Sequence, residues 1–83
     1  MFTMCQSGNQ GVVGENTTCA FAENVQRAFY ASGMANQFSA YSPATGERYD
    51  MNCAGLYSAH FTSGQVLTST HCYAGDNAEV VIW

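Results

Sequence analysis

The segment Thr17–Tyr30, TTCAFAENVQRAFY, decides the fold, because it has the clearest helical pattern in the chain. Its apolar residues recur at helical spacing and form one face: Phe21, Val25 and Phe29. The hydroxyl of Thr17 or Thr18 can cap the first turn, and Gly33 suits the left-handed position that ends a helix. A helix of about four turns is marginal alone, so this one needs a surface to cover.

The chain beyond this helix is predicted to form β-structure. Strands are predicted at 38–41, 47–53, 66–73 and 78–83, whereas 54–63 fits either a strand or a loop. Pro43 and Gly46 suit a turn between the first two strands. The helix is expected to cover the apolar sheet residues Tyr49, Met51, Val80 and Ile82.

The predicted fold class is therefore α+β. One N-terminal helix packs on a three- to four-stranded antiparallel sheet, and disulfides staple the two layers. This single domain is expected to span 17–83. Residues 1–16 are rich in glycine and are predicted to form a flexible arm, in which 1–5 fits a short strand.

The chain has 4 Cys in 83 residues. A chain of this size buries only about 60–65% of its unfolded surface, so disulfides are a common source of extra stability. Four cysteines allow three pairings, and the sequence favours Cys5–Cys19 with Cys53–Cys72, since the last two are expected on inward strand faces. A bond from Cys19 to a strand stays open, as do reduced thiols.

The charge pattern limits the choice of partners. The chain has 2 basic and 6 acidic residues and a net charge of −4, which lacks the basic surface that nucleic acid or an anionic membrane requires. No segment approaches the roughly 20 apolar residues of a membrane span. The start of the chain lacks the pattern of a signal peptide. An extracytoplasmic or secreted domain is expected, or alternatively a component of a virion.

Three spaced patterns occur in order: Thr18-Cys19-x-Phe21-Ala22-x-Asn24-Val25, Tyr41-Ser42-Pro43-x-Thr45-Gly46-x-x-Tyr49-x-Met51-x-Cys53 and Cys72-x-x-Gly75-x-Asn77-Ala78-x-Val80-Val81-x-Trp83. Together they resemble a small domain of actinobacterial, especially mycobacterial, extracytoplasmic proteins. The resemblance covers about 17–83, with a longer stretch between Cys53 and Cys72 than is typical of that domain. It implies a fold and a location and brings no activity with it. A phage-borne copy would account for the absent signal peptide.

No candidate catalytic or metal site has a specific sequence pattern. Four residues are of types that bind zinc, but their spacing lacks the close pairs of structural zinc sites: Cys53, His60, His71 and Cys72. Residues of the types found in catalytic triads lack a nucleophile elbow: Ser58, His60, Ser63 and Asp76. The carboxylates that could form a glycosidase pair are expected in solvent: Glu47, Asp50, Asp76 and Glu79. We predict no catalytic residue, no metal and no cofactor.

The aromatic residues exceed what a small core needs. Several are expected inside, and the remainder are predicted to form an exposed patch on the second sheet face, made of Tyr57, Phe61, Tyr73, Val81 and Trp83. The favoured function is a non-catalytic extracytoplasmic binding or accessory module that uses this patch for a protein partner or for self-association. The alternative is a structural or decoration protein of a phage particle, whose arm becomes ordered only in the assembly. A small enzyme would require His60 or His71.

Overall fold

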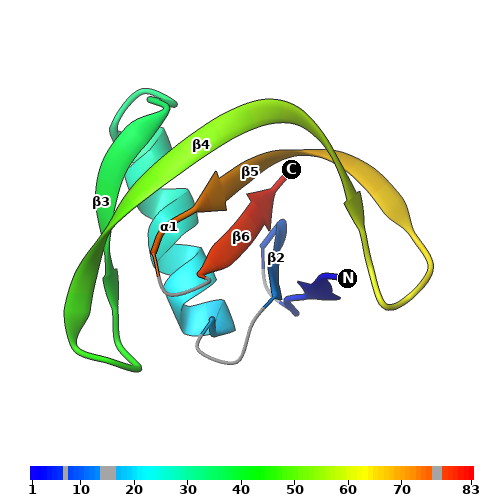
Figure 1. Ribbon diagram of the computed structural model, residues 1–83, viewed down its shortest axis with the longest axis horizontal. Helices are drawn as coiled ribbons and strands as arrows, with labels where there is room; N and C mark the ends of the chain where they lie inside the picture. Colours follow the sequence, from blue (N-terminus) through cyan, green and yellow to red (C-terminus); the bar gives the residue numbers. More distant parts are fainter. Residues whose placement is uncertain (7, 14–16, 76–77) are drawn as a thin grey trace.

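The computed structural model describes residues 1–6, 8–13, 17–75 and 78–83. They form one helix and six strands: β1 (Thr3–Met4), β2 (Gln10–Val13), α1 (Cys19–Ala31), β3 (Gln37–Ser42), β4 (Glu47–His60), β5 (Val66–Tyr73) and β6 (Glu79–Ile82). The strands make one antiparallel sheet in the order β1-β2-β6-β5-β4-β3. The predicted α+β class is confirmed, whereas the predicted number of three to four strands is too low. In Figure 1, β4 and β5 arch from β3 to a hairpin tip beside the N-terminus.

Capping residues set both ends of helix α1. The Thr18 hydroxyl accepts a hydrogen bond from the Phe21 backbone N–H at 3.2 Å, which satisfies one free donor of the first turn. At the other end Gly33 has a φ of 75°, and the Met34 N–H bonds the Phe29 carbonyl at 2.8 Å. This six-residue closure is a Schellman motif, and it satisfies carbonyl groups that the last turn leaves free.

A first core lies between α1 and the sheet. The buried helix face packs on inward-facing strand residues, and together they form a cluster that includes Phe21, Val25, Phe29, Met51, Val80 and Ile82. Tyr49 is partly buried beside this cluster, with its ring centroid 5.6 Å from that of Phe21. The predicted contact between helix stripe and sheet is therefore confirmed.

Both disulfides belong to the first core. Cys5 is bonded to Cys19, which joins the chain after β1 to the start of α1. Cys53 is bonded to Cys72, its direct partner across β4 and β5. These are the pairs that the sequence favours.

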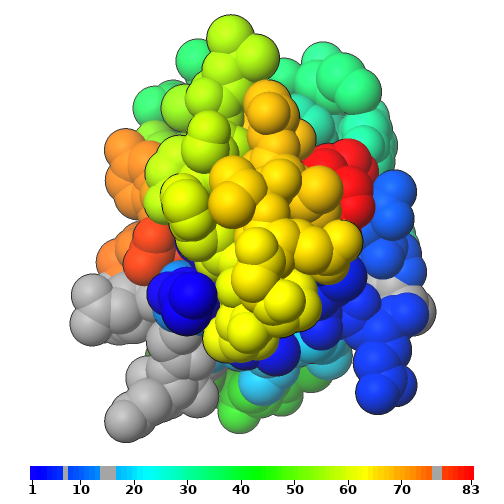
Figure 2. Space-filling view, turned by 90° about the vertical axis from the view of Figure 1, so that its right-hand side faces the viewer, coloured from blue at the N-terminus to red at the C-terminus, as the bar shows by residue number. Residues whose placement is uncertain are grey.

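A second core lies on the opposite face of the sheet. Strand β4 has a bulge, where Gly55 and Leu56 together face the single residue Thr70 of β5. Beyond the bulge the hairpin folds over the sheet, and its tip lies over the first residues of the chain, as Figure 2 shows (yellow over dark blue). The buried members of this core are Phe2, Ala59, Phe61 and Val81.

The N-terminus closes this second core. The Phe2 N–H bonds the His60 carbonyl at 2.8 Å, and the Thr62 N–H bonds the Phe2 carbonyl at 2.9 Å. This bridge joins the residue before β1 to the β4–β5 tip, while β1 itself pairs with β2.

The prediction of a separate arm at 1–16 is wrong for the residues that the structure describes there. β2 pairs with β6 over four residues, and Cys5, Gln10 and Val12 are buried. The many glycines in this segment are typical of a loop, but Gly11 is required for a different reason. A Cβ there would lie 2.7 Å from Cε1 of Phe61, so β2 needs glycine to pass beneath the second core. Residues 7 and 14–16 lie outside the described residues.

We expect each disulfide to stabilise the fold by about 3 kcal/mol, since the bonds close loops of 14 and 19 residues in sequence separation. The variants Cys5→Ala/Cys19→Ala and Cys53→Ala/Cys72→Ala should each lower the free energy of unfolding in urea by this amount. Intact mass should rise by four hydrogens when the wild type is reduced. An unchanged mass would contradict the pairing.

We expect Gly11→Ala to destabilise the protein by about 1–3 kcal/mol, because the added methyl group overpacks the second core. Gly55→Ala is the matched control: its Cβ would meet nothing within 4 Å, so its effect should stay within about 0.5 kcal/mol. Urea unfolding of both variants measures the difference. Equal stabilities would show that β2 does not pass beneath Phe61.

Candidate functional site

The structure divides the predicted binding patch. Phe61 and Val81 are 1% and 0% exposed, so the prediction that they form a surface is wrong. Both lie in the second core, to which the folded β4–β5 tip contributes Phe61. Trp83 is partly buried and packs edge-on against Phe61, with the ring centroids 5.2 Å apart. Tyr57 and Tyr73 remain on the surface, at 37% and 47% exposure.

These two tyrosines flank His71. The ring centroids of Tyr57 and His71 are 4.4 Å apart with nearly parallel planes, and those of His71 and Tyr73 are 5.6 Å apart. On β6, the Oε1 of Glu79 lies 2.9 Å from Nε2 of His71. We refer to Tyr57, His71, Tyr73 and Glu79 as the histidine cluster.

The strand register explains how the cluster forms. His71 and Tyr73 are two residues apart on β5 and share a face, while Glu79 pairs with Tyr73 across the β5–β6 hairpin. Tyr57 joins them only because of the bulge. Without the extra residue it would face Thr68 and point to the other side of the sheet, whereas the bulge pairs it with Ser69.

The cluster rests on the second core. The buried Phe2 ring approaches Tyr57 and His71 edge-on, with centroid separations of 6.1 and 6.2 Å. A surface hollow beside the stack is lined by His71, Tyr73, Ala74 and Glu79. Aromatic faces, an imidazole and a carboxylate thus meet on a supported surface. Among the described residues no three His, Cys, Asp or Glu side chains come together as a metal site would require.

From the sequence alone, His71 and Glu79 are candidates only as metal, catalytic or solvated groups. The predicted strands 66–73 and 78–83 contained a usable signal, since only four residues separate them. A hairpin between these strands places Glu79 opposite Tyr73 and diagonal to His71, as the structure does. The position of Tyr57 had no comparable signal, because the alternation along β4 changes at the bulge.

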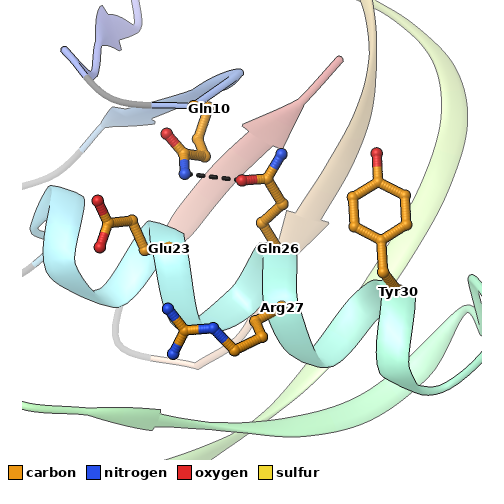
Figure 3. A pocket seen from close by; sticks show the side chains of 6 residues that line it. Gln10, Glu23, Gln26, Arg27 and Tyr30 are labelled. Carbon is orange, nitrogen blue, oxygen red and sulfur yellow. Dashed lines mark hydrogen bonds between the residues drawn. The ribbon is translucent and has the colours of Figure 1, made fainter.

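A second hollow lies between β2 and α1, and Figure 3 shows its side chains. Its described lining is Gly8, Gln10, Glu23, Gln26, Arg27 and Tyr30. The buried Gln10 donates from Nε2 to Oε1 of Gln26 at 2.8 Å, which fastens β2 to the helix. The Oε1 of Gln10 has no hydrogen-bond partner among the described residues. We assign this pair to the fold, since it joins two elements.

No protein-family model, no curated protein and no solved structure matches the chain. The geometry of the described residues is therefore the basis for assigning a function. Two disulfides in so small a domain indicate an oxidising, extracytoplasmic environment. In the described ranges, no helix combines the length and apolar character that crossing a bilayer demands.

The stack around His71 has a spectroscopic consequence. We expect its ring protons to resonate upfield, because the nearly parallel Tyr57 ring shields them. In Tyr57→Leu these resonances should move downfield, as measured by proton–carbon correlation spectra. His60, which is exposed at the end of β4, is the internal control and should not move. Unchanged His71 shifts in the variant would contradict the stacked arrangement.

Proposed function

We propose that this protein is a non-catalytic extracytoplasmic binding module that contacts a protein partner through the histidine cluster. The observation that supports this most directly is the pair of surface tyrosines stacked on either side of His71, beside the Glu79 carboxylate. Tyrosine is enriched at protein interfaces, where its ring supplies contact area and its hydroxyl a hydrogen bond. The resemblance to actinobacterial extracytoplasmic domains agrees with this location.

The cluster is preorganised, which favours binding. Tyr57 contacts both His71 and the buried Phe2, so part of its rotational freedom is already lost in the free protein. Fixing a mobile side chain on association costs about 0.5–1.5 kcal/mol, and a supported ring avoids much of that cost. Tyrosines held in this way have the character of anchor residues at the centre of an interface.

The charge of the cluster favours a cationic partner group. Glu79 is partly exposed beside two aromatic rings, and the whole chain has a net charge of −4. A guanidinium group can stack on a tyrosine face and also donate hydrogen bonds to a carboxylate. The proposed partner therefore presents an arginine to the hollow between Tyr73 and Glu79.

The alternative is a structural or decoration protein of a phage particle. That function requires an N-terminal arm that folds against neighbouring subunits. Phe2 is buried in the protein's own second core, and β2 lies between β1 and β6. We therefore favour the binding module.

The peptide acetyl-Gly-Arg-Gly-amide is a direct probe. We expect it to shift the amide resonances of Tyr73 and Glu79 in nitrogen-15 correlation spectra, whereas the peptide with neutral citrulline in place of arginine should not. In Tyr57→Ala/Tyr73→Ala the affinity should fall at least tenfold, equivalent to about 1.4 kcal/mol. Tyr41→Ala is the matched control, since Tyr41 is a similarly exposed tyrosine on β3 outside the cluster. Equal shifts with both peptides would contradict the cationic assignment.

A photoreactive phenylalanine analogue at position 73 tests the protein partner itself. It should form a crosslink in the exported fraction of a producing cell, and excess unlabelled wild type should compete it away. The same analogue at position 41 should give no such product. Competition by the double tyrosine variant as effective as that by the wild type would overturn the proposed surface.

A further inference from the structure

Met34 and Leu56 share an unusual backbone conformation. Within the described residues they are the only ones other than glycine with a positive φ, at 62° and 58°. Each follows a glycine in the sequence, Gly33 and Gly55. Met34 closes the turn after α1, and Leu56 occupies the β4 bulge.

This conformation is unfavourable for both residues. A side chain with a Cβ in the left-handed region costs roughly 1–2 kcal/mol, a cost that glycine avoids. Both side chains are also largely in solvent, at 61% exposure for Met34 and 91% for Leu56. Burial within this chain therefore does not offset the conformational cost at either residue. An observed strain of this kind is grounds for a functional hypothesis.

The two residues line one apolar hollow of about 250 Å³. The hollow lies between the end of the helix and the strands, and its other lining residues are Phe29, Tyr30, Thr68, Ser69, Thr70, Ile82 and Trp83. Its lining contains no charged side chain and shares no residue with the histidine cluster. It is therefore a separate surface from the proposed partner site.

We propose that this hollow joins two copies of the chain in a two-fold dimer, in which Leu56 of each copy enters the hollow of the other. A two-fold contact uses the same patch twice, so the patch must contain both a projection and its complementary recess. Leu56 lines the hollow and is 91% exposed, so the patch contains both a projecting side chain and a recess.

The absence of charged side chains from the described lining also permits contact between two acidic copies. Each chain has a net charge of −4, and contact between two copies through acidic residues would be repulsive. The described acidic residues Glu23, Glu47, Asp50 and Glu79 all lie outside the lining. Two copies can therefore meet here by apolar burial. If the proposed function holds, the dimer presents two histidine clusters and gains affinity for a multivalent partner.

Sedimentation equilibrium over loading concentrations from about 1 µM to about 1 mM tests the proposal. The wild type should change from a mass of 8.9 kDa to twice that value as concentration rises. Leu56→Asn should weaken the dimer at least tenfold, because asparagine tolerates the left-handed conformation but removes the apolar projection. Its thermal midpoint as a dilute monomer should not fall, which separates loss of contact from loss of fold.

Val66→Thr is the matched control. Val66 is an exposed apolar residue of β5 outside the lining, so this variant should dimerise as the wild type does. A wild type that stays monomeric throughout the series would overturn the proposal, as would a Leu56→Asn variant that dimerises unchanged. Binding of laurate to monomeric wild type, weakened by Leu56→Asn, would also overturn it, since the hollow would then be a site for an acyl chain. None of these results depends on the histidine cluster.

Discussion

The structure depends on the bend in β4. A single helix of 13 residues covers one face of the sheet, and six strands expose a second face that also contains apolar residues. The chain has no second helix among its described residues to place there. The bulge at Gly55 and Leu56 allows the far half of the β4–β5 hairpin to fold back, so the sheet covers itself with Phe61.

The two cores are held together by different means. Both disulfides lie in the first core, where they tie α1 and β4 to their neighbours. The second core has no cross-link, and its closure comes from the Phe2 bridge and from packing around Val81. The histidine cluster rests on this second core through Phe2. The geometry of the proposed binding surface is therefore coupled to the placement of the chain's first residues, more directly than to the helix.

The parts of the fold that follow local patterns could be predicted from the sequence. The helix and its Thr18 cap, the turn at Pro43 and the pairing of Cys53 with Cys72 each depend on spacing within one segment or on facing strands. β2 could not be predicted, because the residues around Gly11 have the composition of a loop and pair only through distant contacts. The prediction that Val81 is exposed is wrong for a related reason: alternation separates two faces of a strand but does not reveal what covers the second face.

The bulge also connects the fold to both proposed surfaces. One extra residue in a strand moves every later side chain to the opposite face, so the bulge turns Tyr57 toward His71 and Phe61 into the second core. The same extra residue leaves Leu56 with no core to enter. The stack, the second core and the exposed leucine are thus three consequences of one local irregularity. All three therefore depend on the bulge, and the left-handed backbone at Leu56 belongs to the same irregularity.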